Sequence, residues 1–172
     1  METFEAILKR RSIRHFTKQK ISDEMIEKLL QSAMAGPSAH NKQPWQFYVI
    51  KDPQIQDELR QASQYTNLNS SLMIVVAGDD KRSLDHRIND FWIQDCSAAI
   101  ENMLLTATDL GLGSCWCGLF PLVTPIKRVR EILNLDKTII PLALLHFGYP
   151  DEKKEARTQY DPQRVHYFDN KK

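Results

Sequence analysis

The chain has 172 residues, of which 42% are hydrophobic, and this is enough for one domain with a buried core. Its 23 Lys and Arg residues are balanced by 22 Asp and Glu residues, so the formal net charge is only +1. This balance argues against a protein that binds nucleic acid over a broad basic surface. No apolar run approaches the roughly 18 residues that a membrane-spanning helix needs. We therefore expect neither nucleic acid nor a membrane as a partner.

The cysteines and the first residues indicate where the protein works. Cys96, Cys115 and Cys117 are an odd number and give no disulfide framework. Residues 1–5 are acidic and do not have the pattern of a secretory signal. We therefore expect a reducing, cytoplasmic location.

Hydrophobic periodicity, capping residues and turn residues predict a regular series of helices and strands. The expected elements are helix 2–10, helix 22–34, strand 46–51, helix 52–62, strand 72–77, helix 89–110, strand 114–119, helix 125–135 and strand 139–148. Ser22 is the expected N-cap of the second helix, and Gly36-Pro37 ends that helix. The run 72–77 is apolar throughout, which is typical of a strand covered on both faces.

This order of elements predicts an α/β or α+β domain, in which helices surround a four-stranded sheet. Residues 1–150 form the expected domain, and the chain shows no repeat and no second domain. Residues 151–172 are charged and have no helical or strand period before Val165. This C-terminal arm is either disordered or wraps around a partner, for which a second subunit is a candidate.

A basic cluster follows the first predicted helix. Arg10, Arg11 and Arg14 flank Ser12, and guanidinium groups beside a hydroxyl can form charge-assisted hydrogen bonds to a phosphate. A solvated basic face is the alternative, and for three arginines taken alone it is the more frequent outcome.

Familiar catalytic motifs are absent from the sequence. The chain has no P-loop, no nucleophile elbow and no His-Glu-x-x-His zinc motif. Cys115-Trp116-Cys117 directs two thiols to one face of a strand, but no second pair or nearby His completes a metal site, so buried cysteines are favoured. We assign no catalytic residue and no metal ligand. An organic cofactor would then have to carry any chemistry.

Residues 37–45, Pro-Ser-Ala-His-Asn-Lys-Gln-Pro-Trp, connect a predicted helix to a predicted strand. A proline near each end restricts the backbone, and short polar residues fill the middle. Such a turn can present polar groups to a ligand, although an ordinary connection has the same composition.

Four segments in order resemble motifs of the FMN-dependent nitroreductase family. Residues 10–16 (RRSIRHF) resemble its Arg-Arg-Ser-x-Arg-x-Phe signature, and residues 37–45 resemble its Pro-Ser-x-x-Asn-x-Gln-Pro-Trp turn. Residues 109–116 (DLGLGSCW) resemble the Gly-Leu-Gly stop after its central helix, and residues 147–150 (FGYP) resemble the Gly-Tyr-Pro before its C-terminal tail. These motifs extend over nearly the whole chain.

The resemblance implies a homodimeric α+β flavoprotein with FMN at the dimer interface. Its fold would be a mixed sheet of four strands surrounded by helices, with a C-terminal strand swapped from the partner when residues 151–172 exchange. Its activity would be hydride transfer from NAD(P)H through FMN to a small organic acceptor, such as a nitroaromatic or quinone, in a ping-pong cycle. Reductive dehalogenation or flavin cleavage on the same fold is an alternative, and a nonenzymatic nucleotide-binding module is another.

The resemblance also implies roles for the basic cluster. Arg10 and Ser12, helped by Arg11, would hold the phosphate and ribityl end of FMN. Arg14 would face the pyrimidine edge near N1 and O2, where a fixed cation stabilises the negative charge left when hydride reaches N5.

Further positions beside FMN are implied by the same motifs. They are Pro37, Ser38, Ala39, Asn41, Gln43, Cys115, Trp116, Cys117, Gly118, Lys154 and Arg157. Residues 37–39 would pack beside the ring from the other subunit, while Asn41 and Gln43 would brace the turn. Residues 115–118 would present backbone groups near N5, and Lys154 or Arg157 would reach the phosphate. The contact expected near residues 63–67 is not assigned, because no lysine lies there.

Overall fold

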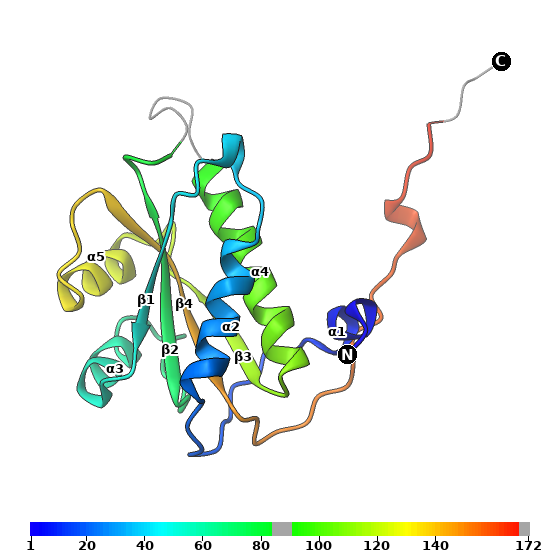
Figure 1. The fold of residues 1–172 in the computed structure, drawn as a ribbon, viewed down its shortest axis with the longest axis horizontal. Helices are drawn as coiled ribbons and strands as arrows, with labels where there is room; N and C mark the ends of the chain where they lie inside the picture. The colour runs from blue at the N-terminus through cyan, green and yellow to red at the C-terminus, as the bar shows by residue number, and fades with distance from the viewer. Residues whose placement is uncertain (84–90, 169–172) are drawn as a thin grey trace.

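The computed structural model describes residues 1–83 and 91–168, and its centre is one sheet of four strands (Figure 1). The strands are β1 (Trp45–Ile50), β2 (Leu72–Asp79), β3 (Gly113–Gly118) and β4 (Ile139–Gly148). Their order across the sheet is β1-β2-β4-β3, and each neighbouring pair is antiparallel. β3 is therefore an edge strand of the sheet.

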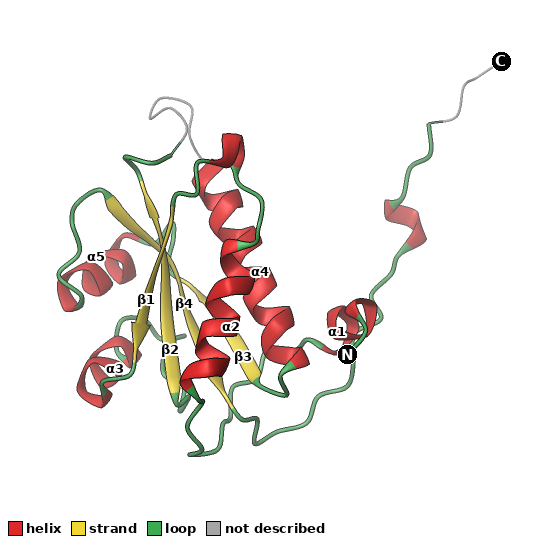
Figure 2. Cartoon of the chain, viewed as in Figure 1, coloured by secondary structure: helices red, strands yellow, loops and turns green. Residues whose placement is uncertain are grey.

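Helices cover both faces of this sheet, which gives a three-layer arrangement (Figures 1 and 2). They are α1 (Thr3–Lys9), α2 (Asp23–Met34), α3 (Pro53–Arg60), α4 (Phe91–Asp109) and α5 (Val123–Ile132), with short 3₁₀ turns η1 (Ala39–Asn41) and η2 (Pro162–Arg164). α2 and α4 lie on one face, and α3 and α5 on the other (Figure 1). In the part of the chain that is described, no helix is both long and apolar enough to cross a membrane.

Strand β2 supplies both hydrophobic cores. Ile74 and Val76 belong to the larger core beneath α2 and α4, whereas Met73 and Val75 belong to the smaller core beneath α3 and α5. Side chains alternate between the faces of a strand, so a run that is apolar at every position is buried on both sides. The prediction of a strand covered on both faces is confirmed.

The predicted helix ends are also present. The Ser22 hydroxyl accepts a hydrogen bond from the Met25 backbone N–H at 3.3 Å, as expected of an N-cap. Gly111 follows α4 with φ of 73°, a conformation that glycine adopts at little cost. The expected start of α4 at Asn89 lies outside the described residues.

The α+β class with four strands is confirmed, but the expectation of a mixed sheet needs a correction. All pairings among the four strands are antiparallel, and the described parallel pairing is an isolated bridge between Ser12 and Ser114. Residues 151–168 contain no strand in this single chain. A fifth strand contributed by a partner stays a prediction.

Candidate cofactor site

The segment Arg10–Phe16 runs along the edge strand β3. Besides the Ser12–Ser114 bridge, the Ile13 backbone N–H donates to the Ser114 carbonyl at 2.8 Å. Ile13 is buried, and a Cβ built on Gly113 would lie 2.9 Å from the Cβ of Ile13, so only glycine allows this close approach. The middle of the segment, at Ser12 and Ile13, is thereby fixed to the edge of the sheet.

The three arginines of this segment have different surroundings. Arg10 Nε lies 3.4 Å from Glu101 Oε1 of α4. Arg11 Nη1 donates to the Glu155 carbonyl, while its buried Nε has no hydrogen-bond partner among the described residues. The side chain of Arg14 is exposed. The predicted cluster therefore offers one open guanidinium and one unsatisfied buried donor.

The beginning of the C-terminal tail lies against the same segment. Lys154 Nζ donates to the Ser12 carbonyl at 2.7 Å and lies 3.1 Å from Glu152 Oε2. Glu152 Oε1 accepts from the backbone N–H groups of Arg14 at 2.5 Å and His15 at 3.3 Å. These hydrogen bonds hold the pKa of Glu152 below its usual value, so the carboxyl is ionised at neutral pH. An ammonium has three donors, which leaves Lys154 one more for a ligand.

Arg157, the second tail candidate, is placed differently. Its backbone N–H donates to the Leu8 carbonyl at 2.9 Å, and its side chain is exposed. Among residues 1–83 and 91–168, the Lys154 side chain binds the segment 10–16, whereas the Arg157 guanidinium forms no hydrogen bond or ion pair.

Cys115 and Cys117 are free and buried on the same side of β3, as predicted for a C-x-C strand. The pKa of Cys115 is lowered to about 7, first by a hydrogen bond from Cys117 and then by the cations of Arg14 and Lys154, against the opposing effect of burial. The Cys117 thiol lies 3.0 Å from the Tyr65 carbonyl, and its pKa is raised, chiefly by Cys115 and by burial. Lys154 Nζ binds the Ser12 carbonyl opposite Ser114, and Arg14 belongs to the same segment, so both cations belong to the edge of the sheet beside Cys115.

Trp116 and Gly118 are exposed on the same strand. A Cβ added to Gly118 would meet no atom of the described part of the chain within 4 Å, so open space borders the end of β3 there. An open strand end, two cations and the unsatisfied Arg11 Nε together fit a flat molecule with a phosphate group.

The turn at residues 37–43 is a rigid unit of its own. The Ala39 backbone N–H donates to Oδ1 of the buried Asp95 in α4 at 2.9 Å, and the Gln43 N–H donates to the Ser38 hydroxyl at 3.0 Å. His40, Asn41 and Gln43 all have φ near 50°, a conformation that is unfavourable for residues with a side chain. The prediction that Asn41 and Gln43 brace the turn remains open, since both side chains are exposed.

The two halves of the predicted site do not meet within one chain. The turn is anchored by Asp95 near the beginning of α4, whereas the Met1 amino group lies 2.7 Å from Asp109 at the end of that helix. Figure 1 shows η1 and α1 close to opposite ends of α4. Among the described residues, no hydrogen bond or ion pair joins residues 37–43 to the Arg10–Phe16 segment or to the tail.

Most of this chain matches the sequence model of a known protein family. Residues 7–71 and 64–149 match the model described as "Nitroreductase family". The chain belongs to the nitroreductase family. A relative from Archaeoglobus fulgidus, provisionally named an NADH dehydrogenase/NAD(P)H nitroreductase, is 41% identical over 170 residues, covering 96% of this chain and 97% of the relative.

Solved structures agree with this assignment. An FMN-dependent nitroreductase from Clostridium difficile is 29% identical, with a TM-score of 0.87, and the match covers 97% of this chain and 99% of the other. A provisionally named nitroreductase from Desulfovibrio desulfuricans, solved in complex with FMN, is 27% identical with a TM-score of 0.83, and the match covers 99% of both chains.

Three residues that contact the candidate site were missed by the sequence reasoning: Asn69, Asp95 and Glu152. Each uses a side chain to bind backbone groups of a segment far away in the sequence. Isolated polar residues in a loop, a helix and a charged tail show no periodicity that would indicate such a contact. Asp151-Glu152 directly follows the FGYP motif at residues 147–150, and that proximity is the one available signal for Glu152.

Proposed function

We propose that the protein binds FMN and transfers hydride from NAD(P)H to a small organic acceptor, such as a nitroaromatic or a quinone. Membership of the nitroreductase family supports the reaction class, and the names of the relatives support the nicotinamide and the flavin. The observation that carries the proposal is the Arg10–Phe16 segment, which is fixed along β3 with Lys154 at its side.

The residues of this segment would bind and orient the cofactor. Arg10, Arg11 and Ser12 supply donors for the phosphate and ribityl end, and Lys154 has one donor free for the same group. Arg14 places a cation at the pyrimidine edge, where it stabilises developing negative charge. When bound, FMN supplies the capacity to accept and donate hydride. The protein side chains contribute position and electrostatics rather than a general acid or base.

The acceptor would use the pocket after the oxidised nicotinamide leaves, which is a ping-pong cycle. The open space beside Gly118 supports a single shared pocket at the end of β3. Residues 115–118 would line it through their backbone groups.

A second subunit would complete the site. Residues 37–39 lie far from the Arg10–Phe16 segment in one chain, so a partner copy would supply them. Residues 158–168, which follow the last backbone hydrogen bond between the tail and the rest of the chain, run away from the body of the chain (Figure 1), and Tyr160 and Phe168 are 76% and 96% exposed. Burial of such aromatic side chains against a partner would stabilise a homodimer with exchanged arms.

Absorbance and steady-state kinetics test this proposal. Purified protein, loaded with FMN if necessary, should show flavin absorbance and oxidise NADH or NADPH only when an acceptor is present. Initial rates at several acceptor concentrations should give parallel double-reciprocal lines. The acceptors should include a nitroaromatic, a quinone and a halogenated phenol, since the last would reveal reductive dehalogenation. Protein that stays colourless and does not bind added FMN would refute the proposal.

A further inference from the structure

The backbone of residues 12–16 lies at the edge of the sheet with few partners from the sheet itself. Ile13 donates to Ser114, and the His15 carbonyl accepts from the Asp151 N–H at 2.9 Å. The N–H groups of Arg14, His15 and Phe16 have no backbone acceptor among the described residues. Arg14 and His15 are exposed, so water could solvate their N–H groups, whereas a side-chain acceptor ties the segment to another part of the chain. Such acceptors therefore add to the backbone hydrogen bonds in fixing the position of Arg14.

Side chains from two distant parts of the chain fill them. Glu152 accepts from the N–H groups of Arg14 and His15, at 2.5 and 3.3 Å. Asn69 accepts from the Phe16 N–H at 3.0 Å and donates to the Phe16 carbonyl at 2.8 Å. The Asn69 amide thus pairs with Phe16 in the way that a neighbouring strand would.

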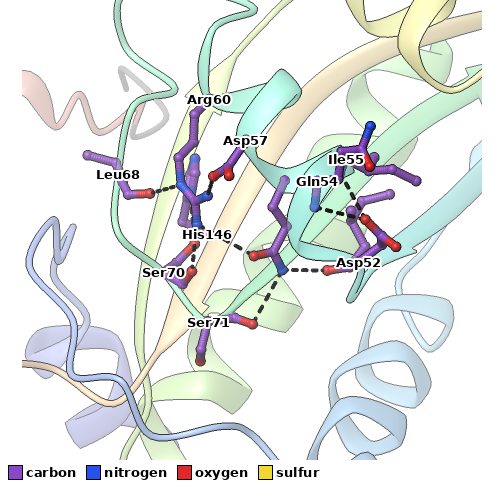
Figure 3. A network of polar contacts seen from close by, with 11 residues as sticks. Asp52, Gln54, Ile55, Asp57, Arg60, Leu68, Ser70, Ser71 and His146 are labelled. Carbon is purple, nitrogen blue, oxygen red and sulfur yellow. Dashed lines mark hydrogen bonds and ion pairs between the residues drawn. The ribbon is translucent and has the colours of Figure 1, made fainter.

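Asn69 is itself held firmly. Arg60 Nε donates to the Leu68 carbonyl at 2.9 Å, and Arg60 Nη2 donates to the Ser70 carbonyl at 3.2 Å. The Ser70 hydroxyl forms a 2.7 Å hydrogen bond with Nδ1 of the buried His146 on β4. Figure 3 shows Arg60 directed toward Leu68 and Ser70, the residues on either side of Asn69 in the sequence, with His146 next to Ser70. The carbonyls on both sides of Asn69 are consequently fixed to α3.

Phe16 is held on its other side as well. It is 2% exposed, and a Cβ placed on Gly148 would lie 2.8 Å from its Cδ1. Its ring packs against β4 while its backbone is bound by Asn69. A shift of this residue would therefore disturb both contacts.

We propose that Glu152 and Asn69 are positioning residues, which hold the backbone from Arg14 to Phe16 and so set where the Arg14 guanidinium meets the flavin. The inference rests on the proposed function for its flavin part. Glu152 also pairs with Lys154, so one carboxylate places both a pyrimidine-edge cation and a phosphate-binding cation. Neither Glu152 nor Asn69 needs to touch the cofactor.

Amide hydrogen exchange in the flavin-free protein tests the backbone part of the proposal. Glu152→Ala should speed the exchange of the Arg14 and His15 amides, and Asn69→Ala that of the Phe16 amide, each about ten-fold or more relative to wild type. Asp151→Ala is the matched control, since it removes an adjacent exposed carboxylate that forms no side-chain hydrogen bond in the described residues. Equal exchange in wild type, Glu152→Ala and Asn69→Ala would overturn the proposal.

FMN titration and flavin potentiometry test the effect on Arg14. Glu152→Ala should weaken FMN binding about ten-fold to a hundred-fold, because Arg14 and Lys154 would no longer be held where their cations form charge-assisted contacts with FMN. It should also lower the reduction potential of the bound flavin, while Glu152→Gln, which keeps an acceptor oxygen, should give a smaller change. In an Arg14→Ala background, Glu152→Ala should no longer change the potential.

These outcomes separate the two hypotheses. If wild type binds no FMN, the proposed function fails, and hydrogen exchange still decides whether the backbone is held. If wild type binds FMN but the Glu152 and Asn69 variants keep its affinity and potential, the proposed function stands and the positioning role is refuted.

Discussion

His146 is a fully buried titratable residue outside the candidate site. Its Nδ1 binds Ser70, and its Nε2 has no hydrogen-bond partner in the part of the chain that the structure describes. Burial, followed by the charge of Arg60, lowers the pKa of His146 to about 3. The folded protein therefore keeps this imidazole neutral at pH values where an unfolded chain would protonate it.

This difference predicts an acid-sensitive stability. Between the unfolded pKa near 6.5 and the folded value, the unfolded state binds one more proton, so the free energy of unfolding falls as the pH falls. From pH 7 to 5 the loss should be about 2 kcal/mol, at about 1.4 kcal/mol per pH unit below pH 6.5. Urea unfolding of wild type and His146→Asn, which keeps an acceptor near Ser70, measures it. Equal pH dependence in the two proteins would show that His146 is not the source of the acid sensitivity.

Alanine substitutions at two glycines of β3, Gly118 and Gly113, distinguish an effect on FMN binding from an effect on stability. Gly118→Ala adds a methyl group to open space, so the free energy of unfolding should hardly change. If the flavin lies beside this strand end, the same variant should weaken FMN binding about ten-fold. Gly113→Ala is the contrast, because its methyl group would overlap Ile13 and should lower stability by about 1–3 kcal/mol. Unchanged FMN affinity in Gly118→Ala would place the cofactor elsewhere.

At the scale of elements, the turn at residues 37–43 depends on α4. Asp95 is buried and holds the Ala39 N–H, so its loss would leave that N–H unsatisfied beside three strained residues. Asp95→Ala should destabilise the protein by about 1–3 kcal/mol, whereas Asp95→Asn should cost less because it keeps an acceptor. Thermal unfolding and amide exchange at Ala39 measure the effect. Identical results for the two variants would show that this hydrogen bond does not stabilise the turn.

The elements that the sequence predicts well are those set by local patterns. α2 has a stripe of apolar residues and the Ser22 cap, and β2 is an apolar run that packs on two cores. Both signals lie within a dozen residues, so they can be found without knowledge of the fold. The basic residues of the candidate site were found through motifs.

The contacts that the sequence does not predict join segments that lie far apart in the chain. Glu152 and Asn69 bind a segment that is more than 50 residues away in the sequence. Their partners are backbone groups, which are the same in every residue type. A pairing of complementary side chains, which the sequence could show, is therefore not involved. The antiparallel pairing of all four strands likewise depends on strand order, which hydrophobic periodicity does not contain.

At the scale of the whole molecule, the tail should hold a dimer together. Truncation after Arg157 keeps Glu152 and Lys154 but removes the exposed aromatic residues Tyr160 and Phe168. The full chain should sediment at twice its 20.0 kDa mass, while the truncated chain should dissociate at micromolar concentration with its fold intact. A truncated chain that stays as dimeric as wild type would exclude arm exchange as the source of dimer stability.

We propose above that a flavin held by the Arg10–Phe16 segment carries hydride between two substrates. Anaerobic stopped-flow absorbance of FMN-loaded protein tests it most directly, with wild type and Arg14→Ala compared. In wild type, NADH or NADPH should bleach the flavin band, and later addition of a nitroaromatic or a quinone should restore it. Arg14→Ala should bleach at least about ten-fold more slowly, because it lacks the cation that stabilises the developing charge. A flavin that neither nicotinamide bleaches, or one bleached equally fast without Arg14, would contradict this account.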